Sequence, residues 1–449
     1  MSDFERFHYD SVHDLLEELD ELGLHLPVSD EFGSLAEPAP LGPVTAPNRL
    51  AVHPMEGCDC SPHGTPGELT RRRYLRFAAG GAGLIWMEAC AVVPEGRANP
   101  RQMMLTEKNL SVFADLLKEM RRAAREAAGN GHEPVIFLQL THSGRYSRPS
   151  GRAEPVLAHH TLPLDRAQGI PRDHPLISDQ ELDRLQEAYV ASARLAVRAG
   201  FDGVDVKACH GYLVAGLLAA RTRRDSRYGG PEYEDRTRFL RRVHRRIGAE
   251  AEGLVVTSRL GLWDPMPHPW GWGANKENPM QTDLAEPLRL VAELHEQGAP
   301  CISMTTGNPY YHPCYNRPFD TPTAEGNAPD EHPLTGVHRM LQIGRRVQRP
   351  HPDLLLVGTG YSYLRHFMPH FAAGALREGW AGMVGLGRGA IAYPDFARDV
   401  LQEGAVDPDR VCIACSRCSQ LMRDGMPSGC VVRDGEVYGP LYRQGRRDA

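Results

Sequence analysis

The chain has 449 residues, of which 41% are hydrophobic, and it carries a formal net charge of −6. That length is enough for a sizeable core in one large domain or two to three ordinary ones, and the mildly acidic balance argues against a nucleic-acid-binding protein. No apolar run approaches the length needed to span a membrane, which argues against a membrane protein.

The N-terminal region, residues 1–34, is acidic and is predicted to form a separate helical extension. One helical face carries the apolar residues Val12, Leu15, Leu16, Leu19 and Leu22. We expect this helix to dock on the main body or on a second subunit, so a homo-oligomer is an open expectation. Residues 1–5 lack the basic and apolar regions of a signal peptide, which predicts a cytoplasmic protein.

Apolar strand-like runs and amphipathic helical patterns then alternate through the chain. Strands are predicted at 49–53, 83–87, 134–140, 203–207, 254–260, 301–305, 354–358 and 382–386. Helices are predicted at 67–79, 110–128, 179–199, 233–247, 283–297, 336–349, 364–378 and 394–402. Eight strands alternating with eight helices predict an α/β protein with a parallel (β/α)8 TIM barrel over residues 35–405, although a doubly wound open sheet gives a similar string.

Three of the predicted strand-to-helix loops are long, at 141–178, 261–281 and 306–335. They are rich in proline, histidine and aromatic residues. Long loops on one rim of a barrel roof a pocket, and they also serve as contacts to a partner subunit.

The stretch that follows the fourth predicted strand concentrates proton-transferring side chains. Lys207, His210 and Tyr212 lie within six positions at a strand end, where a barrel of this type places its catalytic groups. The alternative is a buried tyrosine, a satisfied histidine and a solvated lysine. Lysine occurs only four times in the chain, and only lysine among the basic pair loses its proton when desolvated, which adds interest to Lys207.

The last two predicted strands end in glycine-rich turns. Gly358-Thr359-Gly360 and Gly387-Arg388 occupy the strand ends where barrels of this type recurrently bind phosphate. Glycines let backbone N–H groups approach an anion, and Arg388 offers a forked pair of donors. Because neither turn is a dinucleotide fingerprint, a mononucleotide is the expected ligand.

Four cysteines are spaced as Cys412-x2-Cys415-x2-Cys418-x11-Cys430 after the last predicted helix. Three thiolates at that spacing fit a tight loop around one corner of an iron–sulfur cluster, and the fourth returns from a distance. Zinc is the alternative, although zinc ribbons pair their ligands in two separate Cys-x2-Cys knuckles. We predict a 4Fe–4S-binding segment and tail over residues 406–449.

Several ordered motifs resemble the Old Yellow Enzyme family of FMN-dependent barrels, over roughly residues 40–430. The motifs are Asn48-Arg49, Pro54-Met55, Glu88-Ala89, Gln139 to Arg145, His210 to Leu213, Arg224 to Gly230, Arg236 to Phe239, Arg259 and Gly387-Arg388. The iron–sulfur branch, with 2,4-dienoyl-CoA reductase, enoate reductases and trimethylamine dehydrogenase, is the most similar one. The cysteine segment lies where those relatives bind a 4Fe–4S cluster.

The resemblance implies a set of FMN-binding residues. Pro54, Met55 and Ala89 would line the flavin ring, and Gln139 would hydrogen-bond its pyrimidine edge. Arg259 would stabilise negative charge on the reduced ring. The turn Gly358-Thr359-Gly360 and the pair Gly387-Arg388 would hold the phosphate.

The resemblance also implies a reaction, the reduction of an activated C=C bond in an enoate, enoyl-CoA or enone. Hydride would come from FMN N5, Tyr212 would protonate the α-carbon, and His210 would polarise the substrate oxygen. Lys207 replaces a second histidine of many relatives, and an ammonium there favours a carboxylate or thioester oxygen. Glu56, next to the flavin, would pair with Lys207 or repel anionic substrates, and the sequence leaves both open.

Two further expectations concern the loop at 306–335 and the electron supply. His312 lies near the second acid of dienoyl-CoA reductase, with Tyr311 as a competitor for that place. The chain ends about nineteen residues after Cys430, without room for the FAD- and NAD(P)H-binding domains of the long relatives. We therefore expect ferredoxin, an electron-transfer flavoprotein or a flavoprotein subunit as partner, or direct reduction by NAD(P)H.

Two alternatives to C=C reduction remain at this point. One is an amine or N-methyl dehydrogenase of the trimethylamine dehydrogenase type. The other, from a different class, is a non-redox barrel that binds a phosphate-bearing ligand.

Overall fold

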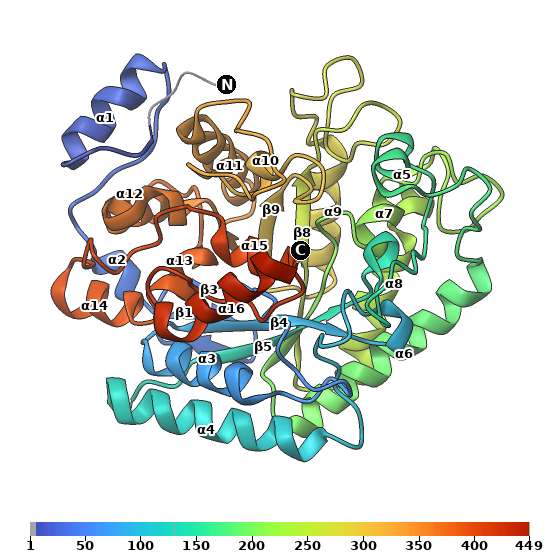
Figure 1. The fold of residues 1–449 in the computed structure, drawn as a ribbon, viewed down its shortest axis with the longest axis horizontal. Coiled ribbons are helices and arrows are strands. Elements are labelled where there is room, and N and C mark those ends of the chain that lie inside the picture. The colour runs from blue at the N-terminus through green and yellow to red at the C-terminus, as the bar shows by residue number, and fades with distance from the viewer. Residues whose placement is uncertain (1–5, 130, 449) are drawn as a thin grey trace.

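One sheet of parallel strands organises the computed structural model, which describes residues 6–129 and 131–448 (Figure 1). Residues 1–5, which bear on the expected absence of a signal peptide, lie outside the described residues. The strands are β3 (Leu50–Val52), β4 (Leu84–Ala91), β5 (Val135–Thr141), β6 (Gly203–Val206), β7 (Val255–Thr257), β8 (Arg259–Trp263), β9 (Cys301–Thr306), β10 (Leu355–Gly358) and β11 (Met383–Leu386). Every neighbouring pair in this sheet is parallel, which a chain reaches through helical crossovers.

The sheet closes into a barrel, and the predicted fold class is confirmed. Its strand order is β7-β6-β5-β4-β3-β11-β10-β9-β8, and a parallel bridge between Ala208, just after β6, and Leu260 of β8 closes the circle. Strands β7 and β8 together form the fifth predicted strand, interrupted at Ser258. The interruption has a local cause, because the backbone N–H of Arg259 donates to the carboxylate of Asp205.

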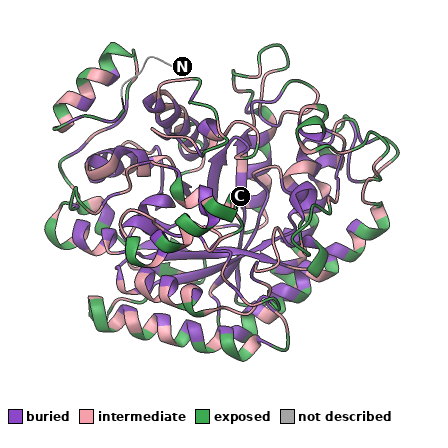
Figure 2. Ribbon diagram, in the orientation of Figure 1, coloured by how far each residue is buried: buried purple, intermediate pink, exposed green. Residues whose placement is uncertain are grey.

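Helices cover the outside of the barrel at the predicted places. The main ones are α3 (Glu68–Ala79), α4 (Leu110–Ala128), α6 (Asp179–Ala199), α8 (Tyr233–Glu250), α9 (Ala285–Glu296), α11 (Pro333–Gln348), α12 (Met368–Arg377) and α14 (Phe396–Glu403). Helix α6 shows why its bounds could be predicted from the sequence. Ser178 and Glu181 form a capping box at its start, and Gly200 ends the helix in a left-handed conformation. Figure 2 shows buried strands inside and exposed outer helix faces.

A short antiparallel hairpin that the sequence did not predict closes the N-terminal end of the barrel. Strands β1 (Ala39–Leu41) and β2 (Val44–Ala46) pack their buried residues against the first residues of the barrel strands and against Trp86 and Phe137. Strands of three residues are too short to give a periodic pattern. This end of the barrel is therefore a packed apolar plug.

The N-terminal extension docks on the main body, as one of the two alternatives expected. Helix α1 (Val12–Glu21) buries Leu15 and Leu19, while Leu22, predicted on the same face, lies just beyond the helix end and is exposed. Before the helix, the ring of Phe7 stacks on Phe367 and lies under the guanidinium of Arg365. Association with a second subunit stays a prediction.

The C-terminal segment returns to the side of the barrel. Helix α15 (Arg417–Arg423) follows the third cysteine, and α16 (Gly435–Asp448) completes the described chain. Asp434, just before α16, forms ion pairs of 2.6 and 2.8 Å with Arg72 and Arg76 of α3. Within the described ranges, no helix has both the length and the apolar character required to cross a membrane.

Candidate active site

The predicted catalytic residues leave β6 at the carboxyl end of the barrel. His210 and Gly211 both have positive φ angles, 62° and 70°, and turn the chain from the strand into α7 (Leu213–Leu218). Position 211 requires glycine, because a Cβ atom there would lie 2.5 Å from Nδ2 of Asn308. The turn presents Lys207, His210 and Tyr212 at one rim.

Tyr212 is buried and surrounded by polar groups. Its hydroxyl donates to Oε1 of Glu56 at 3.0 Å and lies 3.2 Å from the hydroxyl of Tyr310. Burial, followed by the neighbouring Glu56 carboxyl, raises the pKa of Tyr212 well above its ordinary value. The phenol therefore holds its proton and is oriented by two partners.

Lys207 pairs with Glu56, which settles one of the alternatives that the sequence left open. The distance from Nζ to Oε1 is 3.4 Å, and the side chains are 5% and 9% exposed. The ammonium also lies 3.8 Å from the centre of the Tyr212 ring. It therefore contacts an aromatic face and a carboxylate at once, a favourable position for a desolvated cation.

Two polar partners orient the ring of His210. Its Nε2 lies 3.1 Å from Nδ2 of Asn316 and 3.2 Å from Oγ1 of Thr305. Asn316 is itself held by the carbonyl of Thr306, to which its Nδ2 donates at 2.9 Å. Burial, then Lys207 and Arg259, lower the pKa of His210 well below its ordinary value, so the ring is neutral.

A buried ionic network holds the loop that carries Glu56. The Arg73 guanidinium contacts Glu88 and Asp59 at 2.6 Å each, and Oε2 of Glu88 accepts from the backbone N–H of Gly57 at 2.8 Å. The network fixes the residue that follows Glu56 and so positions its carboxylate.

Arg259 meets a residue that the sequence analysis did not single out, His53. The Arg259 side chain donates to Nδ1 of His53 at 2.7 Å, and Nε2 of His53 donates to the carbonyl of Gly358 at 3.1 Å. A Cβ at Gly385 would fall 2.2 Å from the His53 ring, so glycine is needed there. His53 thereby connects the predicted flavin-side arginine with the predicted phosphate turn. In the sequence, only its position immediately before the predicted flavin-lining Pro54 could have indicated that His53 belongs to the site.

Below the catalytic residues, the carboxylate of Asp205 is the centre of a hydrogen-bond network. Gln139, predicted to bind the flavin pyrimidine, donates its side-chain amide to Oδ2 of Asp205 at 2.5 Å, and Nε1 of Trp86 donates to the same atom at 3.1 Å. Burial raises the pKa of Asp205 to about 6. Ala89 is buried at the end of β4, and the predicted roles of Gln139 and Ala89 stay predictions.

The predicted phosphate site contains an unpaired buried donor. Arg388 is 7% exposed, its Nη2 donates to the carbonyl of Pro318 at 2.6 Å, and its Nη1 is buried without a hydrogen-bond partner. Gly360, after Thr359, has a φ of 104°, and a Cβ at Gly387 would lie 3.1 Å from Sδ of Met55, the residue after Pro54. An unsatisfied guanidinium beside glycine turns fits an anionic group such as the FMN phosphate.

The loop at 306–335 carries the predicted His312 and a second residue of interest, Tyr310. His312 precedes α10 (Pro313–Asn316), its side chain is 41% exposed, and its Nδ1 lies 3.6 Å from Asp330, so a catalytic role of His312 stays a prediction. Tyr310 lies beside Tyr212, and its ring stacks on Tyr146 at 3.8 Å. The position of a residue in an irregular loop is set by packing, which a spacing of one or two residues does not reveal.

The four cysteines of the C-terminal segment are free thiols, each half-buried. Backbone N–H groups of Ala414 and Arg433 point at Sγ of Cys412 and Cys430, at 3.4 and 3.3 Å. Over residues 6–129 and 131–448, no three His, Cys, Asp or Glu side chains form a group that could hold a metal ion.

Comparison with known proteins identifies the family. The NADH:flavin oxidoreductase / NADH oxidase family matches residues 34–269. An NADPH dehydrogenase of Bacillus pumilus (strain SAFR-032) is 29% identical over 279 residues, 61% of this chain and 73% of that protein. A 4,4'-dithiodibutanoate disulfide reductase of Rhodococcus erythropolis is 26% identical over 432 residues, 92% and 98% of the two chains.

The solved structures show the same fold. A 2-naphthoyl-CoA reductase complex superposes with a TM-score of 0.70 at 20% identity, over 92% of this chain and 58% of that one. The present chain thus spans little more than half the length of that reductase. The family match removes the alternative of a non-redox barrel, and it includes the stretch around Tyr212. The chain is a flavin-dependent oxidoreductase and belongs to the NADH:flavin oxidoreductase / NADH oxidase family.

Proposed function

We propose that this protein reduces an activated C=C bond, in an enoate, enoyl-CoA or cyclic enone, with Tyr212 as the proton donor. The observation that supports this proposal most is the environment of Tyr212. Its phenol is buried and is hydrogen-bonded to Glu56 and Tyr310, and the ammonium of Lys207 lies over its ring. Such a group keeps its proton until an acceptor develops negative charge beside it. FMN, when bound, would supply the hydride.

The side chains divide the remaining work. His210 offers a ring N–H to the substrate oxygen, where charge develops as the double bond is reduced. Tyr212 gives its proton to the α-carbon and recovers one through Tyr310, whose side chain is 46% exposed and reaches solvent. Glu56, at 3.0 Å, keeps the phenol aimed during that exchange.

The protein's own residues supply a site for FMN. Arg388 and the turns at Gly358-Thr359-Gly360 and Gly387 would hold the phosphate, and Arg259 would face the negatively charged edge of the ring. Pro54, Met55, Ala89 and Gln139 would contact the ring itself. His53 supports both ends, because it bonds to Arg259 and to Gly358.

The runner-up function, dehydrogenation of an amine or N-methyl group, meets an obstacle in Lys207. The rings of Tyr146, Tyr212 and Tyr310 form an aromatic wall of the kind that attracts a cationic ligand. The ammonium of Lys207 already occupies the face of Tyr212, and a second cation beside it would be repelled. The charge distribution favours a neutral or anionic substrate.

We also propose a 4Fe–4S cluster on Cys412, Cys415, Cys418 and Cys430. The N–H groups aimed at Cys412 and Cys430 are the kind of hydrogen bond that tunes such clusters. Positive φ angles at Ala414 and Ser416 curl the chain between the first three thiols. Zinc is the alternative, but zinc ribbons pair their ligands in two separate Cys-x2-Cys knuckles, which the spacing of these four cysteines does not give.

The cluster would connect the site with an electron source outside the barrel. We propose a partner protein, either ferredoxin, an electron-transfer flavoprotein or a flavoprotein subunit, that docks near residues 412–449, with direct reduction by NAD(P)H as the alternative. The ten cysteines are all unpaired thiols, as expected in a reducing compartment, and a cytoplasmic location is part of the proposal.

Three measurements test the proposal on anaerobically purified protein. A visible spectrum and iron analysis report flavin and cluster, and colourless, iron-free protein after reconstitution would sink both cofactors. Stopped-flow mixing with NADH or NADPH tests the partner, because fast flavin bleaching without added protein contradicts it. Turnover is then compared among a crotonate-type acid, its CoA thioester, a tertiary amine and 4,4'-dithiodibutanoate, and activity confined to the amine would refute C=C reduction.

A further inference from the structure

A large basic pocket lies outside the catalytic residues described so far. It has a volume of about 630 Å³, and Arg221, Arg224, His268 and Lys276 contribute to its lining. None of the described residues that line it is acidic. Four nitrogenous side chains around one cavity make it a candidate for binding a multiply charged anion.

The positive charge of this pocket is only partly neutralised. Arg221 shares the carboxylate of Glu286 with Arg236, at 2.9 and 2.6 Å. In the part of the chain that the structure describes, neither Arg224 nor Lys276 has a side-chain ion pair or hydrogen bond. Burial, followed by the charges of Arg221 and Lys276, lowers the pKa of His268.

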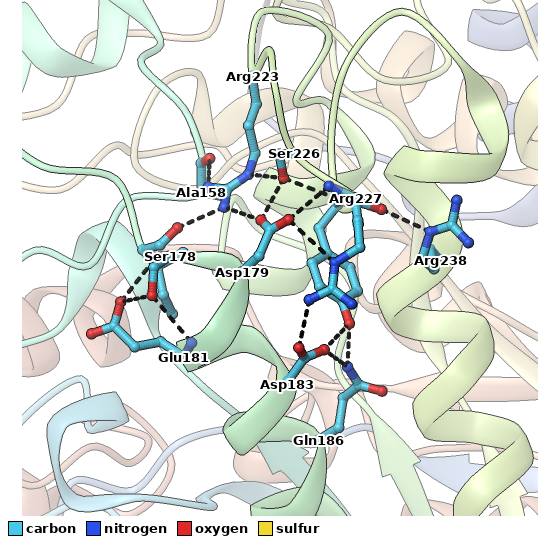
Figure 3. A network of polar contacts seen from close by, with 12 residues as sticks. Ala158, Ser178, Asp179, Glu181, Asp183, Gln186, Arg223, Ser226, Arg227 and Arg238 are labelled. Carbon is cyan, nitrogen blue, oxygen red and sulfur yellow. Dashed lines mark hydrogen bonds and ion pairs between the residues drawn. The ribbon is translucent and has the colours of Figure 1, made fainter.

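The loop that carries Arg224 is held in place by its neighbour. Arg223 is buried and donates to the carbonyls of Ala158 and Ile177, at 2.9 and 2.6 Å, and to Asp179 and Ser226, at 2.9 and 2.7 Å (Figure 3). Arg223 is thus the structural arginine of this segment, and Arg224 is left exposed at the pocket. A fixed loop loses little backbone entropy when it binds a ligand, so that only the side chain of Arg224 has to be ordered.

The pocket is connected to the catalytic residues by two elements. Helix α7, which begins directly after Tyr212 and ends before Arg221, has six residues and is about 9 Å long. In the loop at 261–281, Met266 and Trp270 line a small cavity against Tyr212, while His268, between them, lines the basic pocket. A ligand that reaches from one place to the other follows a single short helix and one loop.

We propose that this pocket binds the phosphate groups of a nucleotide-bearing ligand whose reacting end lies at Tyr212. Two sources share that chemistry, the nucleotide end of a CoA thioester substrate and the phosphorylated adenosine of NADPH. The placement of the reacting end rests on the proposed function, whereas the phosphate recognition rests on the pocket alone. Guanidinium and ammonium groups are the side chains that recognise phosphate oxygens.

The test measures binding to the flavin-containing protein by titration calorimetry, with CoA, NADPH and NADH as probes. We expect the double variant Arg224→Ala, Lys276→Ala to bind its phosphorylated ligand roughly tenfold or more weakly, because it loses two cations that form charge-assisted hydrogen bonds with phosphate. The matched control is Arg377→Ala, Lys108→Ala, which removes one exposed arginine and one exposed lysine far along the chain, neither with an ion pair in the described structure. We expect that control to bind like the parent protein.

The probes identify the source and separate the two proposals. Weakened CoA binding assigns the pocket to the substrate, and weakened NADPH binding with unchanged NADH binding assigns it to the coenzyme. Equal affinity of the variant and the parent for both phosphorylated probes, or no binding by the parent, overturns the inference. Binding needs no turnover, so a protein that reduces no C=C bond but loses CoA binding in the variant would refute the proposed function and retain the pocket. The melting temperature of each variant controls for folding.

Discussion

Two buried charge clusters that share the loop between Pro54 and Cys60 differ in the length of their ion pairs. Around Arg73, both ion pairs are 2.6 Å long and every partner is at most 6% exposed. Around Lys207, the ion pair to Glu56 is 3.4 Å long, and the ammonium rests on the ring of Tyr212. The loop between Pro54 and Cys60 contributes one carboxylate to each cluster.

The difference suggests that the Arg73 cluster stabilises the loop, whereas the Lys207 cluster takes part in the reaction. Short contacts with several hydrogen bonds repay the desolvation of the Arg73 cluster and fix the loop. The Lys207 cluster is looser and shares Glu56 with a phenol, so its members can rearrange when a substrate enters. We therefore expect changes in the first cluster to alter stability and changes in the second to alter turnover.

The largest expected effect is on catalysis. Tyr212→Phe removes the proton donor and should lower the rate of enone reduction by about 10²–10⁴, because general acid catalysis contributes that much. Single-turnover reoxidation of the reduced flavin by 2-cyclohexenone measures it. The control Tyr311→Phe changes a tyrosine in the same loop as Tyr310, and a Tyr212→Phe protein as fast as this control would break the assignment.

The counterpart in the supporting cluster is Arg73→Met. It leaves the carboxylates of Asp59 and Glu88 buried without their partner and should lower the free energy of unfolding by about 3–5 kcal/mol. Urea denaturation followed by circular dichroism gives the value. Arg71→Met, which removes an exposed ion pair with Glu119, is the control and should change stability little. Equal effects of the two variants would contradict the structural role of the Arg73 cluster.

A smaller effect is expected when Glu56, the carboxylate of the Lys207 cluster, is neutralised. Glu56→Gln removes a negative charge that helps to raise the pKa of Tyr212, so that pKa should fall. The alkaline limb of the rate profile for enone reduction should then move to lower pH. The exposed Glu95→Gln is the matched control. An unshifted alkaline limb would show that Glu56 does not act on the Tyr212 proton.

The last expected effect concerns the stability of the fold at acid pH, which must be measured separately from the loss of activity. Burial lowers the pKa of His244 to about 4, so its neutral ring stabilises the fold above the unfolded value near 6.5. That stabilisation is lost as the pH falls from 6.5 toward 4, by at most about 1.4 kcal/mol per pH unit. His244→Gln should flatten this part of the curve of unfolding free energy against pH. The exposed His13→Gln should leave it unchanged, and identical curves for both variants would contradict the assignment.

The sequence was sufficient for the barrel because its strands and helices are periodic. The helix at 110–128 was predicted to the residue, and the split of the fifth strand at Ser258 escaped because it depends on a side chain of the neighbouring strand. The hairpin Ala39–Ala46 escaped because its strands are too short to show a period.

The site was predictable only where residues follow one another. Lys207, His210 and Tyr212 belong to one strand end, so the sequence shows them together. The resemblance offered the pairing of Glu56 with Lys207 as one of two alternatives, but not the contacts of Glu56 and Tyr310 with Tyr212. These two residues come from distant loops, 156 and 98 residues from Tyr212, and no local pattern reports such a contact. His53 was missed for the same reason, since its meaning depends on Arg259 and Gly358.

The carboxyl group of Asp205 has a consequence for how this enzyme can change. From β6 it accepts hydrogen bonds from Trp86 of β4, Gln139 of β5 and the backbone of Arg259 in β8, and so it ties four strands together beneath the rim. Variation in the roof loops can alter which molecules enter without moving that junction. Directed evolution toward new substrates should therefore accept many exchanges in 261–281 and 306–335 and reject those at Asp205.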